Sequence, residues 1–159
     1  ASGKNVWVHP TDDGVIASPA LADGLVLVGS EDGTFYALDS ESGTVRWKLD
    51  TTLGIASSAA VNGGIVYFGG KDGHLYAITV ANGEQVWRSP SMRSITAAPL
   101  AGESFVCIQG FYGSTQAYDA KTGAELWRAS LGGSLHSTPI VTNDAVYIAT
   151  YAGVLYALG

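Results

Sequence analysis

The sequence predicts an all-β fold, a β-propeller built from four blades of about 40 residues with four strands each. Three observations carry this prediction. Residues 37–47 return at a spacing of 40 residues, as residues 77–87 and 117–127. All four tryptophans occupy one column of this repeat: Trp7, Trp47, Trp87 and Trp127. Short apolar runs recur in every period, as expected of blades that must stack because none can bury its own faces.

The fourth copy of the repeat is split between the two ends of the chain. Residues 157–159 begin it and residues 1–7 resume it, so the 159 residues amount to four periods less one. Gly3 thereby falls in the column of Gly43, Gly83 and Gly123. We expect an N-terminal strand at residues 4–8 to complete the last blade, because closure removes free strand edges that would invite aggregation.

The blades can be placed in chain order within a single domain over residues 1–159. Asp23-Gly24 and Asp32-Gly33 are strong hairpin signals, because glycine adopts a positive φ at no steric cost. In blade one they separate an inner strand at 15–21, a buried strand at 25–28 and a third strand at 34–38, before an outer strand at 44–48. The four blades are predicted at residues 15–48, 55–88, 95–128, and 135–159 with 4–8.

The number of blades in the ring stays open. Four repeats can close alone, or two chains can pair head to tail into eight blades, each N-terminal strand completing the last blade of the other chain. The residues expected to face the axis are not uniformly small: Ile16, Ala56, Thr96 and His136. This favours half of an eight-bladed ring, formed by a dimer or cut from a longer parent, with a self-closed four-bladed propeller as the alternative.

The repeat resembles that of a known family. Ala-x-Asp-x-x-Thr-Gly-x-x-x-Trp, then Ser-x-Pro, then Gly-x-Val-Tyr-x-Gly-x-x-Asp-Gly-x-Leu-Tyr-Ala is similar to the tryptophan-docking repeat of PQQ-like (quinoprotein-type) β-propellers, over the whole chain. The resemblance implies that each indole packs flat on the turn of the adjacent blade and donates its N–H to a backbone carbonyl. The tryptophan and glycine columns are therefore expected to be structural, and losing one tryptophan to alanine should cost ~3–5 kcal/mol.

What the resemblance implies about function is less specific, because one fold serves many functions. The same repeat occurs in the scaffold lipoprotein of the outer-membrane β-barrel assembly machinery, in quinoprotein dehydrogenases and in sensor domains of bacterial kinases. We predict a non-enzymatic protein-interaction or assembly scaffold that is extracytoplasmic by family analogy. The alternatives are an extracytoplasmic ligand-sensing domain of a bacterial kinase and a PQQ-dependent quinoprotein oxidoreductase.

The residues give little support for a cofactor or a metal. PQQ dehydrogenases are implied to need an adjacent cysteine pair, whereas Cys107 is the one cysteine and stands between Val106 and Ile108. The histidines lie at three different phases of the repeat, which does not favour a metal cluster. Asp39 and Asp119 are expected to accept backbone N–H bonds within their turns rather than bind calcium. Ser134 and His136 have no orienting acid nearby in the sequence, so we expect no catalytic residue.

Charge and hydropathy exclude two classes of partner. The net charge is −6, and the eight lysines and arginines are scattered, which argues against nucleic acid. The apolar runs, such as residues 25–28, are too short for membrane insertion. A protein partner, or a second copy of the chain closing the ring as a homodimer, is expected instead.

Departures between repeats are the best indication of a site, because a feature of one blade alone is not required by the fold. One turn carries Glu31-Asp32 in blade one and Lys71-Asp72 in blade two, but Phe111-Tyr112 in blade three and Tyr151-Ala152 in blade four. Aromatic residues are enriched in protein interfaces. With Arg93 and His136 from the loops between blades, Phe111, Tyr112 and Tyr151 form the predicted partner-binding patch.

Overall fold

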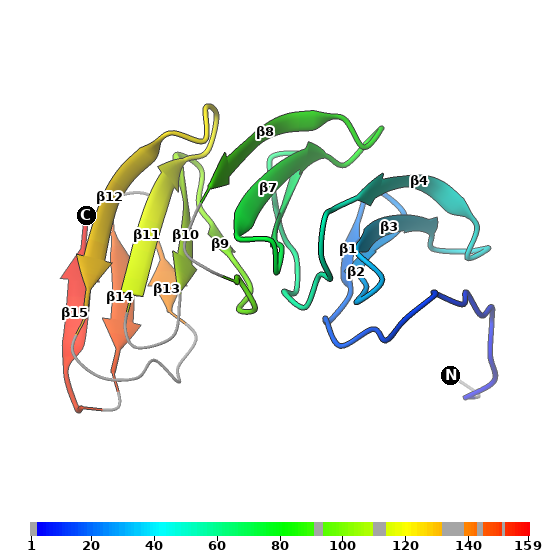
Figure 1. The fold of residues 1–159 in the computed structure, drawn as a ribbon, viewed down its shortest axis with the longest axis horizontal. Helices are drawn as coiled ribbons and strands as arrows, with labels where there is room; N and C mark the ends of the chain where they lie inside the picture. The colour runs from blue at the N-terminus through cyan, green and yellow to red at the C-terminus, as the bar shows by residue number, and fades with distance from the viewer. Residues whose placement is uncertain (1–2, 91–93, 110–113, 132–138, 143–144, 151) are drawn as a thin grey trace.

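The computed structural model describes residues 3–90, 94–109, 114–131, 139–142, 145–150 and 152–159. These residues form strands and turns without a helix, and so without a helix that could cross a membrane. The strands make four antiparallel sheets, one for each repeat, set side by side in a row (Figure 1). The prediction of an all-β fold made of blades is confirmed.

Each sheet runs in chain order from an inner to an outer strand. Blade one contains β1 (Ala20–Ala22), β2 (Leu25–Gly29), β3 (Thr34–Asp39) and β4 (Val45–Asp50). Blade two contains β5 (Ala60–Asn62), β6 (Ile65–Gly69), β7 (His74–Thr79) and β8 (Gln85–Pro90). Blade three contains β9 (Leu100–Ala101), β10 (Phe105–Gln109), β11 (Ser114–Asp119) and β12 (Glu125–Ser130). Blade four contains β13 (Ile140–Val141), β14 (Val146–Ala149) and β15 (Leu155–Leu158).

The inner strands are shorter than the sequence predicts. The apolar run at 15–21, for example, enters the sheet only at Ala20. Pro19, Pro99 and Pro139 stand immediately before β1, β9 and β13. Proline has no N–H to donate to the ladder. However, β5 begins at the same repeat position after Ala59, so the proline is not what sets the start of these strands.

The outer strand pairs with the third strand in the same register in each of the three complete blades. Trp47 lies opposite Ala37, Trp87 opposite Ala77, and Trp127 opposite Ala117. A register shift follows each of these alanines, at the step to Leu38, Ile78 or Tyr118. A bulge bends and twists a strand locally. The repeated bulge therefore brings each tryptophan to the same place on its blade.

The core lies between the blades rather than within them. Phe35 of blade one stacks on Phe68 of blade two, with ring centroids 4.0 Å apart. Leu75 of blade two belongs to the cluster that holds Ile108 of blade three, and Cys107 of blade three to the cluster that holds Ile148 of blade four. Each blade is thus stabilised by its neighbours, as in other repeat proteins.

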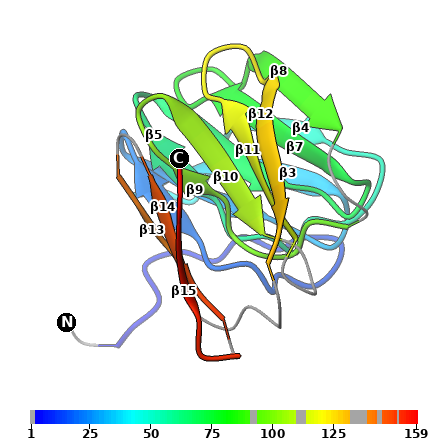
Figure 2. The ribbon, with the colours of Figure 1, turned by 90° about the vertical axis from the view of Figure 1, so that its left-hand side faces the viewer.

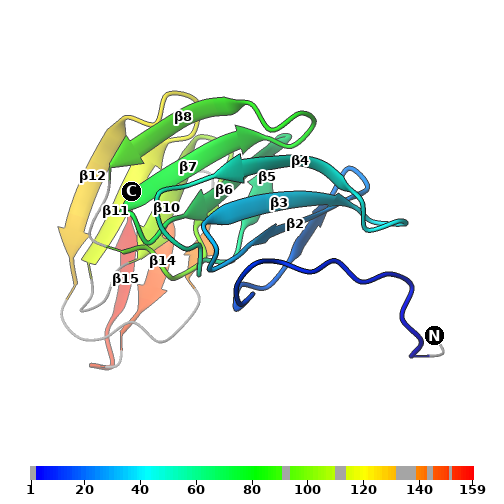
Figure 3. The ribbon, with the colours of Figure 1, turned by 45° about the vertical axis from the view of Figure 1, so that its right-hand side comes forward.

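The row of blades stays open. The N-terminal segment lies beside blade one, whereas β15 stands at the far end (Figures 1 and 2). Residues 4–8 form no strand and run past the blade-one strands, as Figure 3 shows. The expected pairing of this segment with the last blade is not made within one chain, because β15 pairs only with β14 among the described strands and Trp7 docks on blade one instead.

Candidate functional site

The predicted partner-binding patch cannot be placed. Phe111, Tyr112 and Tyr151, and the loop residues Arg93 and His136, all lie outside the described residues. Their role stays a prediction. The structure does describe the strands on either side of residues 110–113, namely β10 and β11, and the equivalent hairpins of blades one and two.

The equivalent hairpins of blades one and two are each held by an aspartate and a tyrosine. Asp32 accepts the Tyr36 hydroxyl at 2.9 Å and the Thr34 N–H at 2.8 Å. Asp72 accepts the Tyr76 hydroxyl and the His74 N–H in the same way. Burial, followed by the hydrogen bond to Asp72, raises the pKa of Tyr76 to about 12. The tyrosine hydroxyls stay protonated and donate to the aspartates, which fixes the hairpins. The role of these pairs is therefore structural.

Blade three lacks this pair. Tyr112 stands where the aspartate is in blades one and two, and Gln116 stands where the tyrosine is. Gln116 is fully buried, with its amide 3.2 Å from the Tyr118 hydroxyl, which also donates to the Pro90 carbonyl at 3.2 Å. The Asp–Tyr hydrogen bond that closes the hairpin in the first two blades therefore has no counterpart among the described residues of blade three.

A second departure in blade three was missed from the sequence. Gln109 and Thr115 lie directly opposite each other on β10 and β11, in the place of Gly69 and Leu75 of blade two. The Gln109 Nε2 and the Thr115 Oγ1 are buried and have no hydrogen-bond partner among the residues that the structure describes. The signal was present in the repeat, as a glycine that becomes glutamine and a large apolar residue that becomes threonine. An unpaired buried polar group costs about 1–3 kcal/mol.

At the other end of the blades, three tryptophans dock on their neighbours. Trp7 donates its indole N–H to the Ser40 carbonyl at 3.0 Å, Trp47 to Val80 at 2.8 Å, and Trp87 to Ala120 at 2.9 Å. The acceptor is 33 residues ahead in each case. The ring lies over a glycine of the same turn, where a Cβ would come within 3 Å: Gly43, Gly83 and Gly123.

Trp127 and Gly3 complete these two columns in the sequence but make no such contact. The Trp127 indole N–H has no acceptor among the described residues. Gly3 has the backbone of a docking turn, with φ of +71° like Gly43, yet a Cβ placed there would meet nothing within 4 Å. The structure thus places all eight residues of the tryptophan and glycine columns and brings three of the four pairs together.

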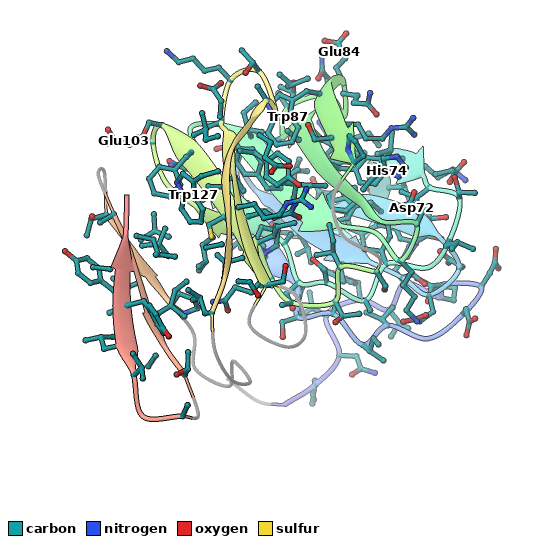
Figure 4. The ribbon with its side chains drawn as sticks, turned by 60° about the vertical axis from the view of Figure 1, so that its left-hand side comes forward. Asp72, His74, Glu84, Trp87, Glu103 and Trp127 are labelled. Carbon is teal, nitrogen blue, oxygen red and sulfur yellow. The ribbon has the colours of Figure 1, made fainter. Side chains whose placement is uncertain are left out.

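A groove lies between blades two and three beside the Trp87 dock. It has a volume of about 530 Å³, with Ile65, Tyr67 and Val86 on its apolar side and Glu103 and Lys121 at its rim. The Tyr67 hydroxyl is buried and points toward the Ala120 carbonyl at 3.5 Å. Figure 4 shows Glu103 well separated from Asp72 and His74. The groove is mostly apolar and presents no buried unpaired polar group.

The described residues hold no group of three or more His, Cys, Asp or Glu side chains that could bind a metal. His9 packs on the Tyr36 ring, while the His74 Nδ1 lies 3.5 Å from Asp72. Asp39 accepts N–H groups from Glu41 and Ser42 within its own turn, and Asp119 does the same from Lys121 and Thr122. Burial raises the pKa of Cys107 to about 12, which leaves the thiol unreactive.

Comparison with known proteins gives one family for the whole chain. The model described as outer membrane protein assembly factor BamB matches residues 1–159. BamB from Moraxella catarrhalis is 26% identical, with a TM-score of 0.78 over 96% of this chain and 49% of that one. The chain thus spans about half the length of the BamB chain that it matches. A search of the curated proteins gave no match.

Two further solved structures show the same architecture. The computationally designed Ika4 protein superposes with a TM-score of 0.83 over 98% of both chains, at 18% identity, which supports the fold alone. A quinohemoprotein alcohol dehydrogenase from Pseudomonas putida HK5 is 30% identical over 85% of this chain, with a TM-score of 0.68, but only 23% of that enzyme is covered.

Proposed function

Because the chain belongs to the family of the outer membrane protein assembly factor BamB, we propose that it is a non-enzymatic scaffold that binds protein partners. The proposal extends to an extracytoplasmic location, by analogy with that family. The observation that supports it most is the missing Asp–Tyr pair of blade three. The fold closes this hairpin with the same hydrogen bond in blades one and two. The sequence has no aspartate to make it in blade three, where Phe111 and Tyr112 stand, or in blade four, where Ala152 replaces the aspartate beside Tyr151.

We place the partner contact on the predicted patch of Phe111, Tyr112, Tyr151, Arg93 and His136. Loops that carry residues the scaffold does not need are where binding residues concentrate. Tyrosine and arginine dominate protein interfaces, because they supply large contact areas with a polar end. The acidic chain, with a net charge of −6, fits a protein partner rather than nucleic acid.

Site-specific photo-cross-linking tests this contact. A photoreactive phenylalanine at position 112, in cells that express the chain, should cross-link to one protein that can be identified. The same group at position 86 is the control, because Val86 is exposed on the outer strand β8, far from that hairpin in the sequence. The cross-link at position 112 should be lost when Arg93 is changed to Glu. Equal cross-linking from both positions would contradict the proposal.

A quinoprotein oxidoreductase is the second candidate, supported by the 30% identity to the alcohol dehydrogenase. Against it stands the lone Cys107 where a cysteine pair is implied. Added PQQ with calcium discriminates the two, because a ligand that binds only the folded state raises its melting temperature. The scaffold proposal expects no shift, and a shift of several degrees that depends on both additives would favour the enzyme.

The two ends of the row of blades form a separate partner surface. We propose that a second copy of the chain covers them, so that two chains complete one ring. The four blades match about half of a BamB chain, which supports the view that they have the curvature of half a ring.

A further inference from the structure

Gly3 and Trp127 are two halves of one contact that the chain does not make with itself. In the other three pairs the indole lies over the glycine, with Cβ-to-ring distances of 2.6 to 2.8 Å. Gly3 has the same left-handed φ but open space where the ring should be. Trp127 has the same position on its outer strand but no acceptor for its N–H among the described residues. Gly3 is thus a docking turn without a tryptophan, and Trp127 a tryptophan without a docking turn.

The rear face of blade four is exposed where its counterparts are buried. Leu155 is 71% exposed. Phe35 of blade one and Leu75 of blade two occupy the same column of the repeat and are 0% exposed. Tyr147 is 41% exposed, whereas Leu27 is fully buried in the same column. In blades one and two these side chains pack against the next blade. The described strands of blade four therefore present one half of a blade-to-blade interface.

The front face of blade one presents the other half. Leu21 is 72% exposed, whereas Val61, Ala101 and Val141 in the same column pack against the preceding blade. The N-terminal segment already lies against this face, because Trp7 packs with Val28, Tyr36 and Leu38. The two ends of the row thus expose apolar faces that correspond to the two sides of an ordinary blade-to-blade interface. Leaving such surface in water costs about 25 cal/mol for each Å².

The N-terminal segment is positioned as the outer strand of a blade that precedes blade one. Trp7 docks on Ser40 and Gly43 as Trp47 docks on Val80 and Gly83. Val6 and Val8, on either side of Trp7, are 85% and 75% exposed. The outer edge of β15 is free, since β15 pairs only with β14 among the described strands. By the register of the complete blades, Trp7 should lie opposite Ala157 when the two pair.

We propose that Trp127 of one copy docks on Gly3 of a second copy, while residues 4–8 of that second copy add an outer strand to β15. The same contact made in both directions closes two rows of four blades into one ring. A second copy fits better than the chain's own N-terminus, because the N-terminal segment and β15 stand at opposite ends of the row (Figure 1). This inference rests on the second copy proposed above as a partner and specifies the contact through which it binds. It does not depend on the result of cross-linking at position 112.

Solution mass by light scattering, on the chain of residues 1–159, tests the contact with matched variants. The wild type should reach twice 16.4 kDa as its concentration rises. Gly3→Ala should weaken this association on the order of tenfold, because a Cβ would occupy the place of the indole. Gly24→Ala is the control, since Gly24 has φ of +73° and equally open space but lies in the β1–β2 turn. Equal association of the two variants would overturn the proposal.

A mixing experiment separates a second copy from self-closure. Leu155→Glu and Leu21→Glu should each remain near 16.4 kDa, because each places a charge in both seams of the ring. A mixture of the two variants should regain mass, since one of its two seams is then unchanged. Leu126→Glu is the control, because Leu126 is 52% exposed on the outer strand β12 and faces neither seam. A wild type that stays at 16.4 kDa at every concentration, or a mixture that does not associate, would overturn the proposal.

Discussion

Trp87 donates its indole N–H to the backbone carbonyl of Ala120, at 2.9 Å and across 33 residues of chain. The contact is buried, and the indole ring lies over Gly123 of the same turn. It joins the outer strand of blade two to the outer turn of blade three. Trp7 and Trp47 make the same bond at the same offset, so the same contact joins the N-terminal segment to blade one and blade one to blade two.

Replacing Trp87 by alanine should lower the free energy of unfolding by about 3–5 kcal/mol, because a large buried ring is lost from the seam. Trp87→Phe keeps most of the apolar volume and loses the N–H, so it should cost about 1 kcal/mol for the hydrogen bond, together with the smaller packing loss. Urea denaturation followed by circular dichroism measures both. A loss below about 1 kcal/mol for the alanine variant would show that the latch does not hold the blades together.

Gly43 should tolerate alanine much less well than Gly24. The two glycines have nearly the same φ, +71° and +73°, so the backbone strain of the substitution is matched. A Cβ at Gly43 would lie 2.6 Å from the Trp7 ring, whereas at Gly24 it would meet nothing within 4 Å. Gly43→Ala should therefore be more destabilising than Gly24→Ala by about 1 kcal/mol or more. Equal melting temperatures for the two variants would contradict the docked position of Trp7.

Acid should weaken the outer turns of blades one and three but not that of blade two. The N–H and hydroxyl of Ser42, with the N–H of Glu41, hold the pKa of Asp39 below its ordinary value. Asp119 has a lowered pKa for the same reason, through Thr122 and Lys121. A lowered carboxyl pKa adds stability above the unfolded value of about 3.9, and this stability is lost as the pH falls through the folded value.

Asp39→Asn should accordingly be less stable than the wild type near pH 7, with the difference shrinking toward about pH 2.5. Thr79 occupies the same column in blade two and carries no charge, so the effect of Thr79→Ala should not depend on pH. Thermal melting at the two pH values measures this. A difference for Asp39→Asn that persists unchanged in acid would mean that the carboxylate charge is not what stabilises the turn.

Thr115→Val should raise the stability of the protein. Valine has nearly the shape of threonine without the hydroxyl, and the Thr115 Oγ1 is buried and has no hydrogen-bond partner in the described part of the chain. Removing an unpaired buried hydroxyl should add about 1 kcal/mol. Thr34→Val is the matched control, because the Thr34 hydroxyl donates to Asp50 at 3.2 Å, so its removal should destabilise. A loss of stability for Thr115→Val would contradict the assignment of an unpaired hydroxyl.

Much of the fold could be predicted from the sequence because the copies of the repeat can be aligned with one another. Trp47, Trp87 and the glycine column stand out by recurrence alone, and the hairpins follow from Asp-Gly turns. The length of the inner strands could not be read from apolar runs, since the run at 15–21 joins the ladder only at Ala20. The number of blades in the ring depends on whether the same chain or a second copy supplies the N-terminal strand. The repeat pattern fits a four-bladed ring of one chain and an eight-bladed ring of two chains equally well.

The site was predicted less completely. The expectation rested on aromatic residues at one turn, Phe111 and Tyr112, which stay predictions. The buried pair of Gln109 and Thr115 lies only a few residues away but was overlooked, because polar residues within a strand do not show from the sequence whether they have partners. Gly3 was placed in its column, but that it would lack its tryptophan is a matter of tertiary contacts, which no pattern of residues contains.

The four indole N–H signals in a nitrogen-15 correlation spectrum test the central claim, which is that the blades are joined by docked tryptophans and that Trp127 docks only on a second copy. Trp127→Phe assigns its signal. We predict that the signals of Trp7, Trp47 and Trp87 are protected from hydrogen exchange at every protein concentration, and that the Trp127 signal becomes protected only as the concentration rises. A Trp127 signal that is protected to the same degree at all concentrations, in a protein of 16.4 kDa, would contradict the account.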